Sequence, residues 1–282
     1  MHGVTGRNAV HLAHRNPLAG DDHLTFEESS HTYTAWGTTI ERSVTSLVAS
    51  LFESFDPDRC ASEHLERWAR DPQSPYHDTI RQVRARGGSD VEASSIIQQA
   101  WSQLGSDAAR LGTALHLYAE LVLNDVSTSA PVELLPEVAQ FHAFQQSAFV
   151  RDAGLQPFRT ELAVAWRDET DPPCRPVTAG QIDCLYRGSD GRVFMVDFKR
   201  VASKHSLTPW ESCYGKYGGS PVEELPDAPF WRYSLQQSLY NVMLHQVRTI
   251  ALAPPPSGAS RSASVHCAMN RVVVADAWGR LR

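Results

Sequence analysis

The residue types best suited to chemistry gather around one short apolar run. The chain has three lysines against twenty-three arginines, and Lys199, Lys204 and Lys216 fall within one stretch of eighteen residues. Because lysine's compact ammonium and arginine's planar guanidinium are not interchangeable, a lysine in so arginine-rich a chain marks a position where the ammonium is needed. Lys199 ends the run Val193-Phe194-Met195-Val196-Asp197-Phe198-Lys199, which predicts a buried strand with an acid and a base at its exit.

The spacing of Asp197 and Lys199 predicts that they share one face of this strand, about 7 Å apart. The preceding strand is joined to it through the turn Gly188-Ser189-Asp190-Gly191, so the two form a hairpin in which Asp183 can approach Asp197. Two carboxylates near a lysine indicate a site for Mg²⁺ or Mn²⁺. Such an ion would polarise a phosphodiester, and Lys199 would orient or help to deprotonate the attacking water. The alternative for an isolated Asp-x-Lys is a surface ion pair.

Four further residues lie where they could join this site. His116 is on a predicted helix with Glu120 one turn later, although a single helical histidine is more often packed or solvent-facing than a ligand. Glu161 is on the strand before the hairpin, where its alternative role is to pair with an arginine. Gln236 and Tyr240 are one turn apart on a later helix, and their alternative is the polar face of an amphipathic helix.

Taken in order, these motifs resemble the PD-(D/E)XK nuclease superfamily, specifically its RecB-like exonuclease branch. The resemblance covers about residues 101–244, half of the chain. The motifs that carry it are Gly112 to His116, Gly180-Gln181-Ile182-Asp183, Val196-Asp197-Phe198-Lys199, and Gln236 to Tyr240.

The resemblance implies a role for each matched residue. His116, Asp183 and Asp197 would hold the metal ion together with the carbonyl oxygen of Phe198, and Lys199 would assist the attacking water. Glu161 matches an acidic strand position beside the catalytic site, while Gln236 and Tyr240 would contact DNA or support the lysine. No four-cysteine pattern for an iron–sulfur cluster and no Walker-type motif accompanies them.

The implied fold class is α/β, or α+β by stricter usage: a central mixed sheet flanked by helices, with a restriction-endonuclease-like core and an N-terminal helical arm. The expected division is a disordered tail over residues 1–20, a hairpin and helical arm over 21–100, and the nuclease core over 101–282. The first twenty residues contain two arginines and no acid, so a weak organellar transit signal is the alternative to a tail.

Periodicity and turn residues predict most of the elements. A hairpin is expected around Trp36-Gly37, followed by a helix that Ser43 or Thr45 caps. A helical stretch should stop near Asp71-Pro72, loops are marked around Pro75 and at Gly87-Gly88, and Gly105 and Gly112 predict a break or close packing in the next long helix. The remaining predictions are helices over residues 61–69, 91–123, 137–150 and 231–247, and strands over 158–166, 178–186, 192–199 and within 264–275.

The long segment after Lys199 interleaves basic and aromatic residues, as stacking grooves for single-stranded nucleic acid do. The candidates for nucleic-acid contact are Lys204, Trp210, Tyr214 and Lys216. The alternative is that the aromatic side chains pack this loop onto the core.

Composition limits the setting of this chemistry. A net charge of −6 argues against a protein that coats nucleic acid non-specifically, but it leaves room for a narrow basic channel and for a protein partner that delivers DNA. Five scattered cysteines and no run of about eighteen apolar residues predict an intracellular protein of a reducing compartment, cytoplasm or nucleus, without a membrane span.

The sequence therefore predicts a Mg²⁺- or Mn²⁺-dependent deoxyribonuclease, an exonuclease acting on DNA ends or single strands. Two alternatives stay open, an RNA endonuclease and a nucleic-acid-binding protein on an inactive nuclease fold.

Overall fold

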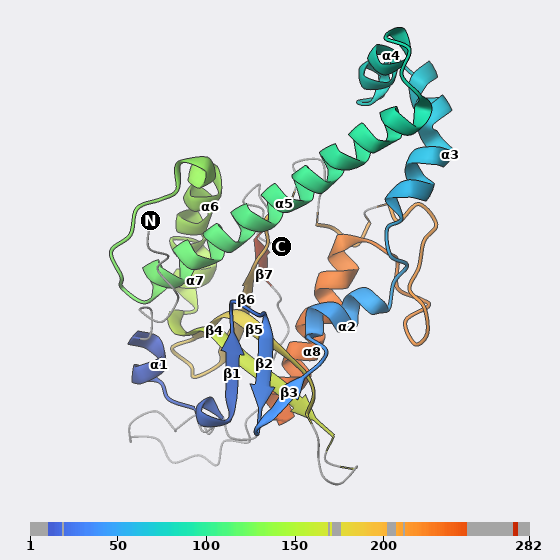
Figure 1. Ribbon diagram of the computed structural model, residues 1–282. Helices are drawn as coiled ribbons and strands as arrows, with labels where there is room; N and C mark the ends of the chain where they lie inside the picture. Colours follow the sequence, from blue (N-terminus) through green and yellow to red (C-terminus); the bar gives the residue numbers. More distant parts are fainter. Residues whose placement is uncertain are drawn as a thin grey trace, which may run out of the picture. The chain divides into compact units, whose positions relative to one another are not determined.

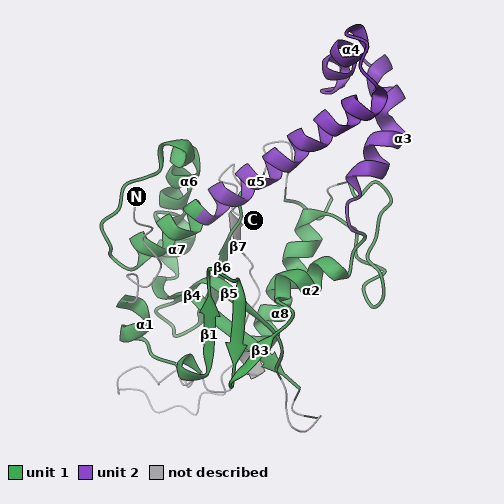
Figure 2. Ribbon diagram, in the orientation of Figure 1, with its two compact units in different colours: residues 1–53, 114–282 green, residues 54–113 purple. Residues whose placement is uncertain are grey.

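The computed structural model describes residues 11–18, 20–168, 170, 176–201, 207–210, 212–246 and 273–275. It is a mixed α/β structure with two sheets and several helices, as predicted (Figure 1). The chain divides into two compact units, one of residues 1–53 and 114–282 and the other of residues 54–113 (Figure 2). The predicted boundary at residue 100 differs from this division, because residues 21–53 belong to the unit that contains the later strands.

The larger sheet carries the predicted central hairpin. Its strands are β4 (Gln156–Arg167), β5 (Pro176–Arg187), β6 (Val193–Phe198) and β7 (Val273–Ala275), in the order β4-β5-β6-β7. The first three are antiparallel neighbours and β7 pairs parallel to β6, so the sheet is mixed. Between β5 and β6, Gly188 N–H donates to the Arg192 carbonyl at 2.8 Å, and Gly191 takes a φ of 82° that favours glycine. The three strands predicted before residue 200 are confirmed.

A smaller antiparallel sheet precedes it in the sequence. It consists of β1 (Leu24–Glu27), β2 (Thr32–Ala35) and β3 (Thr38–Ile40). The predicted hairpin is confirmed as β2 and β3, with positive φ angles of 48° at Trp36 and 75° at Gly37 in the two-residue turn. Its buried side chains pack against Ala165 and Ala179 of the larger sheet. Strand β1 was not expected from the sequence.

Helices of the same unit cover the larger sheet. They are α1 (His11–Arg15), α2 (Val44–Ser50), α6 (Leu135–Gln145), α7 (Ala148–Asp152) and α8 (Pro229–Gln246), with short 3-10 turns at Asp21–His23 and Val132–Leu134. Ser43 caps α2 as predicted, because its hydroxyl accepts a hydrogen bond from Ser46 N–H at 3.1 Å. The single helix expected over residues 137–150 is two helices, since the Ser147 hydroxyl caps a new helix.

The expectation of a disordered tail over residues 1–20 is wrong for residues 11–18, while residues 1–10 and 19 lie outside the described residues. Residues 11–15 form α1, and Leu12 is buried. Its backbone N–H donates to Asn124 Oδ1 at 2.9 Å, and Asn16 Nδ2 donates to the Phe158 carbonyl at 2.9 Å. These contacts fix α1 on the unit that holds the larger sheet.

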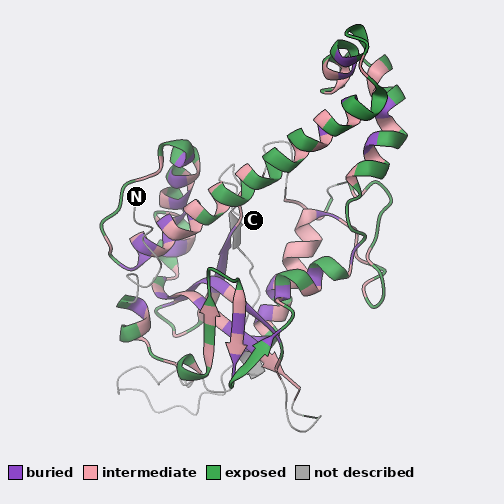
Figure 3. Cartoon of the chain, in the orientation of Figure 1, coloured by how far each residue is buried: buried purple, intermediate pink, exposed green. Residues whose placement is uncertain are grey.

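The hydrophobic core of this unit lies between the larger sheet and the helices α2 and α8 (Figure 3). Buried Val44 and Val48 come from α2, Ile182 from β5, and Met243 from α8. Packing of the larger sheet against α2 and α8 fixes the positions of β5 and β6, which carry the candidate site. Cys60, Cys184 and Cys213 are free thiols. Among the described residues, no helix has both the length and the apolar character needed to span a bilayer.

The second unit is helical. It contains α3 (Pro57–Arg70), α4 (His77–Ala85) and the first part of α5 (Asp90–Leu123), around a core of Leu65, Ile80 and Ile97. The loops predicted around Pro75 and at Gly87-Gly88 flank α4, although α4 itself was not predicted. The break or close packing expected at Gly105 and Gly112 is wrong: α5 is continuous, and a Cβ at either glycine would meet no atom within 4 Å.

Candidate metal centre

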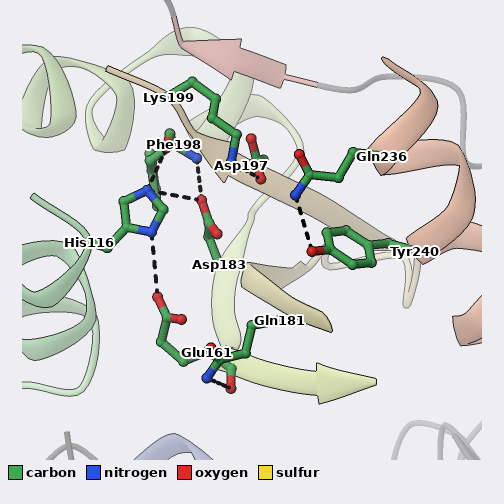
Figure 4. A network of polar contacts seen from close by, with 9 residues as sticks. All are labelled: His116, Glu161, Gln181, Asp183, Asp197, Phe198, Lys199, Gln236 and Tyr240. Carbon is green, nitrogen blue, oxygen red and sulfur yellow. Dashed lines mark hydrogen bonds and ion pairs between the residues drawn. The ribbon is translucent and has the colours of Figure 1, made fainter. Parts of the chain in front are cut away.

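The candidate site lies where β5 and β6 separate. Their pairing ends at Cys184 opposite Val196, and Asp183 and Asp197 are the next residue of each strand. There, Asp183 Oδ2 accepts a hydrogen bond from Phe198 N–H at 2.7 Å, so a carboxylate takes the place of a strand carbonyl (Figure 4). Strand β6 continues to pair with β7 on its other side, with Asp197 opposite Val274. The separation exposes the end of β6 to side chains from other elements.

His116 reaches this opening from α5. Its Nε2 lies 2.7 Å from the Phe198 carbonyl oxygen and 3.6 Å from Asp183 Oδ2, while its Nδ1 lies 3.9 Å from Glu161 Oε1 (Figure 4). One ligand atom from each of His116, Glu161 and Asp183 falls within 4.8 Å of the others. Residues from one helix and two strands therefore converge on one small volume.

Glu161 has an unusual backbone for a strand residue. It lies between Thr160 and Leu162, which pair with Cys184 and Ile182, and this register places it opposite Asp183. Its φ of 44° is in the left-handed region, which non-glycine residues rarely adopt, and such backbone strain concentrates at functional sites. Burial raises the pKa of Glu161 well above its usual value, and the charge of Asp183 adds to the effect. The sequence placed Glu161 beside the site, whereas the structure places it within the cluster of ligand atoms.

Asp197 and Lys199 form a part-buried ion pair at the same strand end. Lys199 Nζ donates to Asp197 Oδ1 at 2.8 Å and lies 5.6 Å from the centre of the Tyr233 ring. Asp197 is 1% exposed, and its second oxygen, Oδ2, has no hydrogen-bond partner among the described residues. Unlike the other expected ligands, Asp197 is therefore turned toward Lys199 with one buried oxygen left over.

The charges of this pair follow from their surroundings. Burial, followed by the charge of Asp183, raises the pKa of Asp197 to about 6, although Lys199 opposes the change. Burial lowers the pKa of Lys199, but the charges of Asp183 and Asp197 outweigh it, and the pKa of Lys199 is raised. At neutral pH Lys199 is accordingly an ammonium group and a hydrogen-bond donor.

The arrangement fits a divalent cation. Adjacent ligands of an octahedral ion bound at 2.0–2.1 Å are about 3 Å apart. From His116 Nε2, the distances to the Phe198 carbonyl oxygen and Asp183 Oδ2, 2.7 and 3.6 Å, lie around that value, whereas Glu161 Oε1 lies 3.9 Å from the other ring nitrogen, Nδ1. The unpartnered Oδ2 of Asp197 supplies a further buried acceptor that a cation or its water would satisfy. Carboxylate and carbonyl oxygens favour Mg²⁺ and Mn²⁺, and a single imidazole is compatible with Mn²⁺.

Gln236 and Tyr240 approach from α8. Gln236 Nε2 donates to the Tyr240 hydroxyl at 3.1 Å (Figure 4). Tyr240 is 2% exposed, and its ring lies directly on Gly180 of β5. Burial raises the pKa of Tyr240 to about 12, so the phenol is neutral. Its burial suits the supporting role that the sequence left open, rather than direct contact with DNA.

Two aromatic residues of the loop are exposed, whereas its Val222 and Leu225 pack against the core. Trp210 and Tyr214 are 86% and 91% exposed, so the alternative in which they pack onto the core is wrong. Lys216 Nζ pairs with Glu53 Oε2 at 3.1 Å on the surface. Lys204 lies outside the described residues.

One contact near the site was missed in the sequence. Arg200 directly follows Lys199 and pairs with Glu137 of α6, 63 positions away, so no local spacing indicated it. Glu120 is not in the cluster of ligand atoms, but burial and, less strongly, the charge of Glu28 raise its pKa to about 7.

No model of a known protein family matches the sequence, and no curated protein is similar to it by sequence.

Proposed function

We propose that this protein is a divalent-metal-dependent nuclease that hydrolyses DNA phosphodiester bonds. The observation that carries the proposal is the convergence of His116, Glu161, Asp183 and the Phe198 carbonyl next to the part-buried pair of Asp197 and Lys199. The order of these residues resembles that in the RecB-like branch of the PD-(D/E)XK superfamily. A mixed sheet flanked by helices supports a restriction-endonuclease-like core in the unit that contains residues 114–282.

His116, Glu161, Asp183 and the Phe198 carbonyl would hold the cation, with Asp197 Oδ2 as an additional acceptor. A bound Mg²⁺ or Mn²⁺ would polarise a phosphoryl oxygen and increase the acidity of the attacking water. The carboxylates would offset the ion's charge, and the hydrogen bond from Phe198 N–H fixes the orientation of Asp183.

Lys199 would act as a cation and donor. Its raised pKa and its hydrogen bond to Asp197 favour a protonated amine, which can orient water and stabilise negative charge that develops on the phosphate. Of the two roles that the sequence left open, orientation of the water is thus preferred over removal of its proton. Gln236 and Tyr240 would hold α8 against the strands that carry the site.

Nuclease assays test the proposal. End-labelled single- and double-stranded DNA and RNA of the same sequence are incubated with the protein in Mg²⁺, Mn²⁺ or EDTA. We expect DNA cleavage only with a divalent cation and a loss of at least about 100-fold in Asp183→Asn. Asp190→Asn, in the exposed β5–β6 turn, is the matched control and should keep full activity. If the parent degrades no DNA, or Asp183→Asn is as active as the parent, the proposal fails.

The same assay separates the alternatives. RNA cleavage without DNA cleavage would identify an RNA endonuclease, and binding without cleavage would identify a binding protein on an inactive fold. The lengths of the labelled products distinguish removal of single nucleotides from ends, as expected of an exonuclease, from internal cleavage.

Metal binding can be measured without any substrate. A ligand of the folded state at 100 times its dissociation constant adds about 2.7 kcal/mol to the free energy of unfolding. Mn²⁺ should therefore raise the melting temperature of the parent in a concentration-dependent way, and EDTA should reverse the rise. His116→Ala should lose this response, whereas His142→Ala, a histidine on α6 outside the cluster, should keep it. An equal Mn²⁺ response in His116→Ala would exclude the metal centre.

A further inference from the structure

Arg200 and Glu137 form a part-buried ion pair at the strand end that carries the candidate site. Arg200 Nε lies 2.8 Å from Glu137 Oε1, and the two side chains are 27% and 15% exposed. Arg200 follows Lys199 directly, and Glu137 lies in the first turn of α6. The pair therefore ties the chain just after Phe198 and Lys199 to a helix of the same unit.

The ion pair leaves part of the guanidinium available. A guanidinium presents five N–H donors in a rigid plane, and Glu137 contacts Nε. Within the described part of the chain, no residue pairs with the two terminal Nη groups of Arg200. Because Nε is held, the plane and direction of the remaining donors are set before any ligand arrives.

The candidate site has more acidic than basic side chains, so binding of a polynucleotide requires a second cation besides Lys199. Glu161 and Asp183 lie in the cluster of ligand atoms, and Lys199 is already hydrogen-bonded to a third acid, Asp197. A polynucleotide brings a negative charge on each phosphate to this acidic surface, so its neighbouring phosphates require cations besides the metal ion. Lys199 lies near Tyr233 of α8, whereas Arg200 is turned toward α6, which places a second cation on another side of the strand end.

We propose that Arg200 binds a phosphate of the nucleic-acid substrate next to the one that is cleaved, and that Glu137 is a positioning residue for its guanidinium. The inference rests on the proposed function, since it takes the ligand to be a polynucleotide. A purely structural ion pair would affect stability alone. A phosphate contact also contributes to the salt dependence of binding.

Salt dependence of binding is the test. The affinity of a fluorescent single-stranded DNA is measured in EDTA over a series of salt concentrations for the parent and Arg200→Gln. Loss of one phosphate contact should weaken binding roughly threefold to tenfold and reduce the slope of log affinity against log salt by about 0.7. Arg192→Gln, which alters an exposed arginine paired with Asp190, is the control and should change neither quantity.

Glu137 is tested by the Michaelis constant for DNA cleavage in Mn²⁺. Glu137→Ala should raise KM with a smaller effect on kcat, because it releases the guanidinium. The KM of Glu137→Gln should stay close to that of the parent, since its amide oxygen still accepts a hydrogen bond from Arg200 Nε. Equal KM values for the parent and Glu137→Ala would remove the positioning role.

An Arg200→Gln variant that binds with the parent's affinity and slope but melts at a lower temperature would overturn the inference. If Arg200→Gln does not fold, Arg200→Lys is used instead. Lysine keeps the ion pair with Glu137 but lacks the planar guanidinium, so this variant should bind the single-stranded DNA at least about threefold more weakly than the parent. Equal affinity refutes the proposal. If the parent binds DNA without cleaving it and Arg200→Gln shows the reduced slope, the nuclease proposal alone fails. A parent that binds no nucleic acid refutes both.

Discussion

Gly180→Ala tests how α8 is fitted to the sheet beside the candidate site. Gly180 lies in β5 under the ring of Tyr240, and a Cβ at this position would be 2.6 Å from Tyr240 Cε1 and 2.7 Å from its hydroxyl oxygen. Real Cβ atoms do not approach other atoms so closely, so the ring or the strand must move. Tyr240 is 2% exposed and hydrogen-bonded to Gln236, so it has little room to retreat.

Two opposed effects determine how much Gly180→Ala changes the free energy of unfolding. Replacing glycine by alanine within a strand favours the folded state by roughly 0.5–1 kcal/mol, because the unfolded chain loses conformational freedom. Overpacking a filled core costs about 1–3 kcal/mol. The steric term is larger, and Gly180→Ala should lower the free energy of unfolding by about 1–2 kcal/mol. Displacement of Tyr240 would also disturb its hydrogen bond with Gln236, so nuclease activity should fall.

Urea denaturation of the parent and variant measures this difference. Gly105→Ala is the control, because its Cβ meets open space in the middle of α5, and it should stabilise the protein by up to about 1 kcal/mol. In a Tyr240→Leu background the obstructing ring is gone, so Gly180→Ala should become close to neutral. Unchanged stability and activity in the single Gly180→Ala variant would refute the steric argument.

Two further predictions concern a buried acid and the exposed loop. Because the pKa of Glu120 is raised from 4.5 to about 7, its contribution to the free energy of unfolding falls as the pH rises through this interval. Glu120 is partly solvated, so the expected effect is discounted to roughly 1 kcal/mol. Measured by urea denaturation, the free energy of unfolding of Glu120→Gln should rise by this amount relative to that of the parent between pH 4 and pH 8. A difference that does not change with pH would contradict this prediction. For the loop, stacking on bases predicts that Trp210→Ala and Tyr214→Ala each weaken single-stranded DNA binding roughly tenfold without loss of stability, while exposed Phe55→Ala does not. Parent-like binding by both loop variants would remove the nucleic-acid role from these side chains.

Much of the central sheet could be predicted because its signals are local. The apolar run that ends at Lys199, the glycine-containing turn before it and the period of two along the strands together determine the hairpin and its register. The register in turn places Asp183 opposite Asp197. The hydroxyl of Ser43 predicted the start of α2 because a cap depends only on the next three residues.

Elements stabilised by distant contacts could not be predicted in this way. Strand β1 has four residues, α1 has five, and neither length would be stable alone. Helix α1 is held by Asn124, far along the chain, and α4 by the core around Ile80. The same applies to the pair of Arg200 and Glu137, whose partners are 63 positions apart. Sequence spacing carries no information on which distant residue a side chain will meet.

At the candidate site, three neighbouring strands each carry one irregular feature. Glu161 adopts a left-handed φ, Asp183 takes the backbone N–H of Phe198, and Asp197 buries an oxygen without a hydrogen-bond partner among the described residues. Each departure has a cost, of about 1–3 kcal/mol for strained backbone and a similar amount for an unsatisfied buried polar atom. A sheet selected only for stability would not place these costs together. Glu161 and Asp183 offer oxygens to one cluster with His116, and a cation bound there would offset part of these costs. The irregularities that sequence periodicity could not predict therefore support the proposed metal centre, in addition to the order of the motifs.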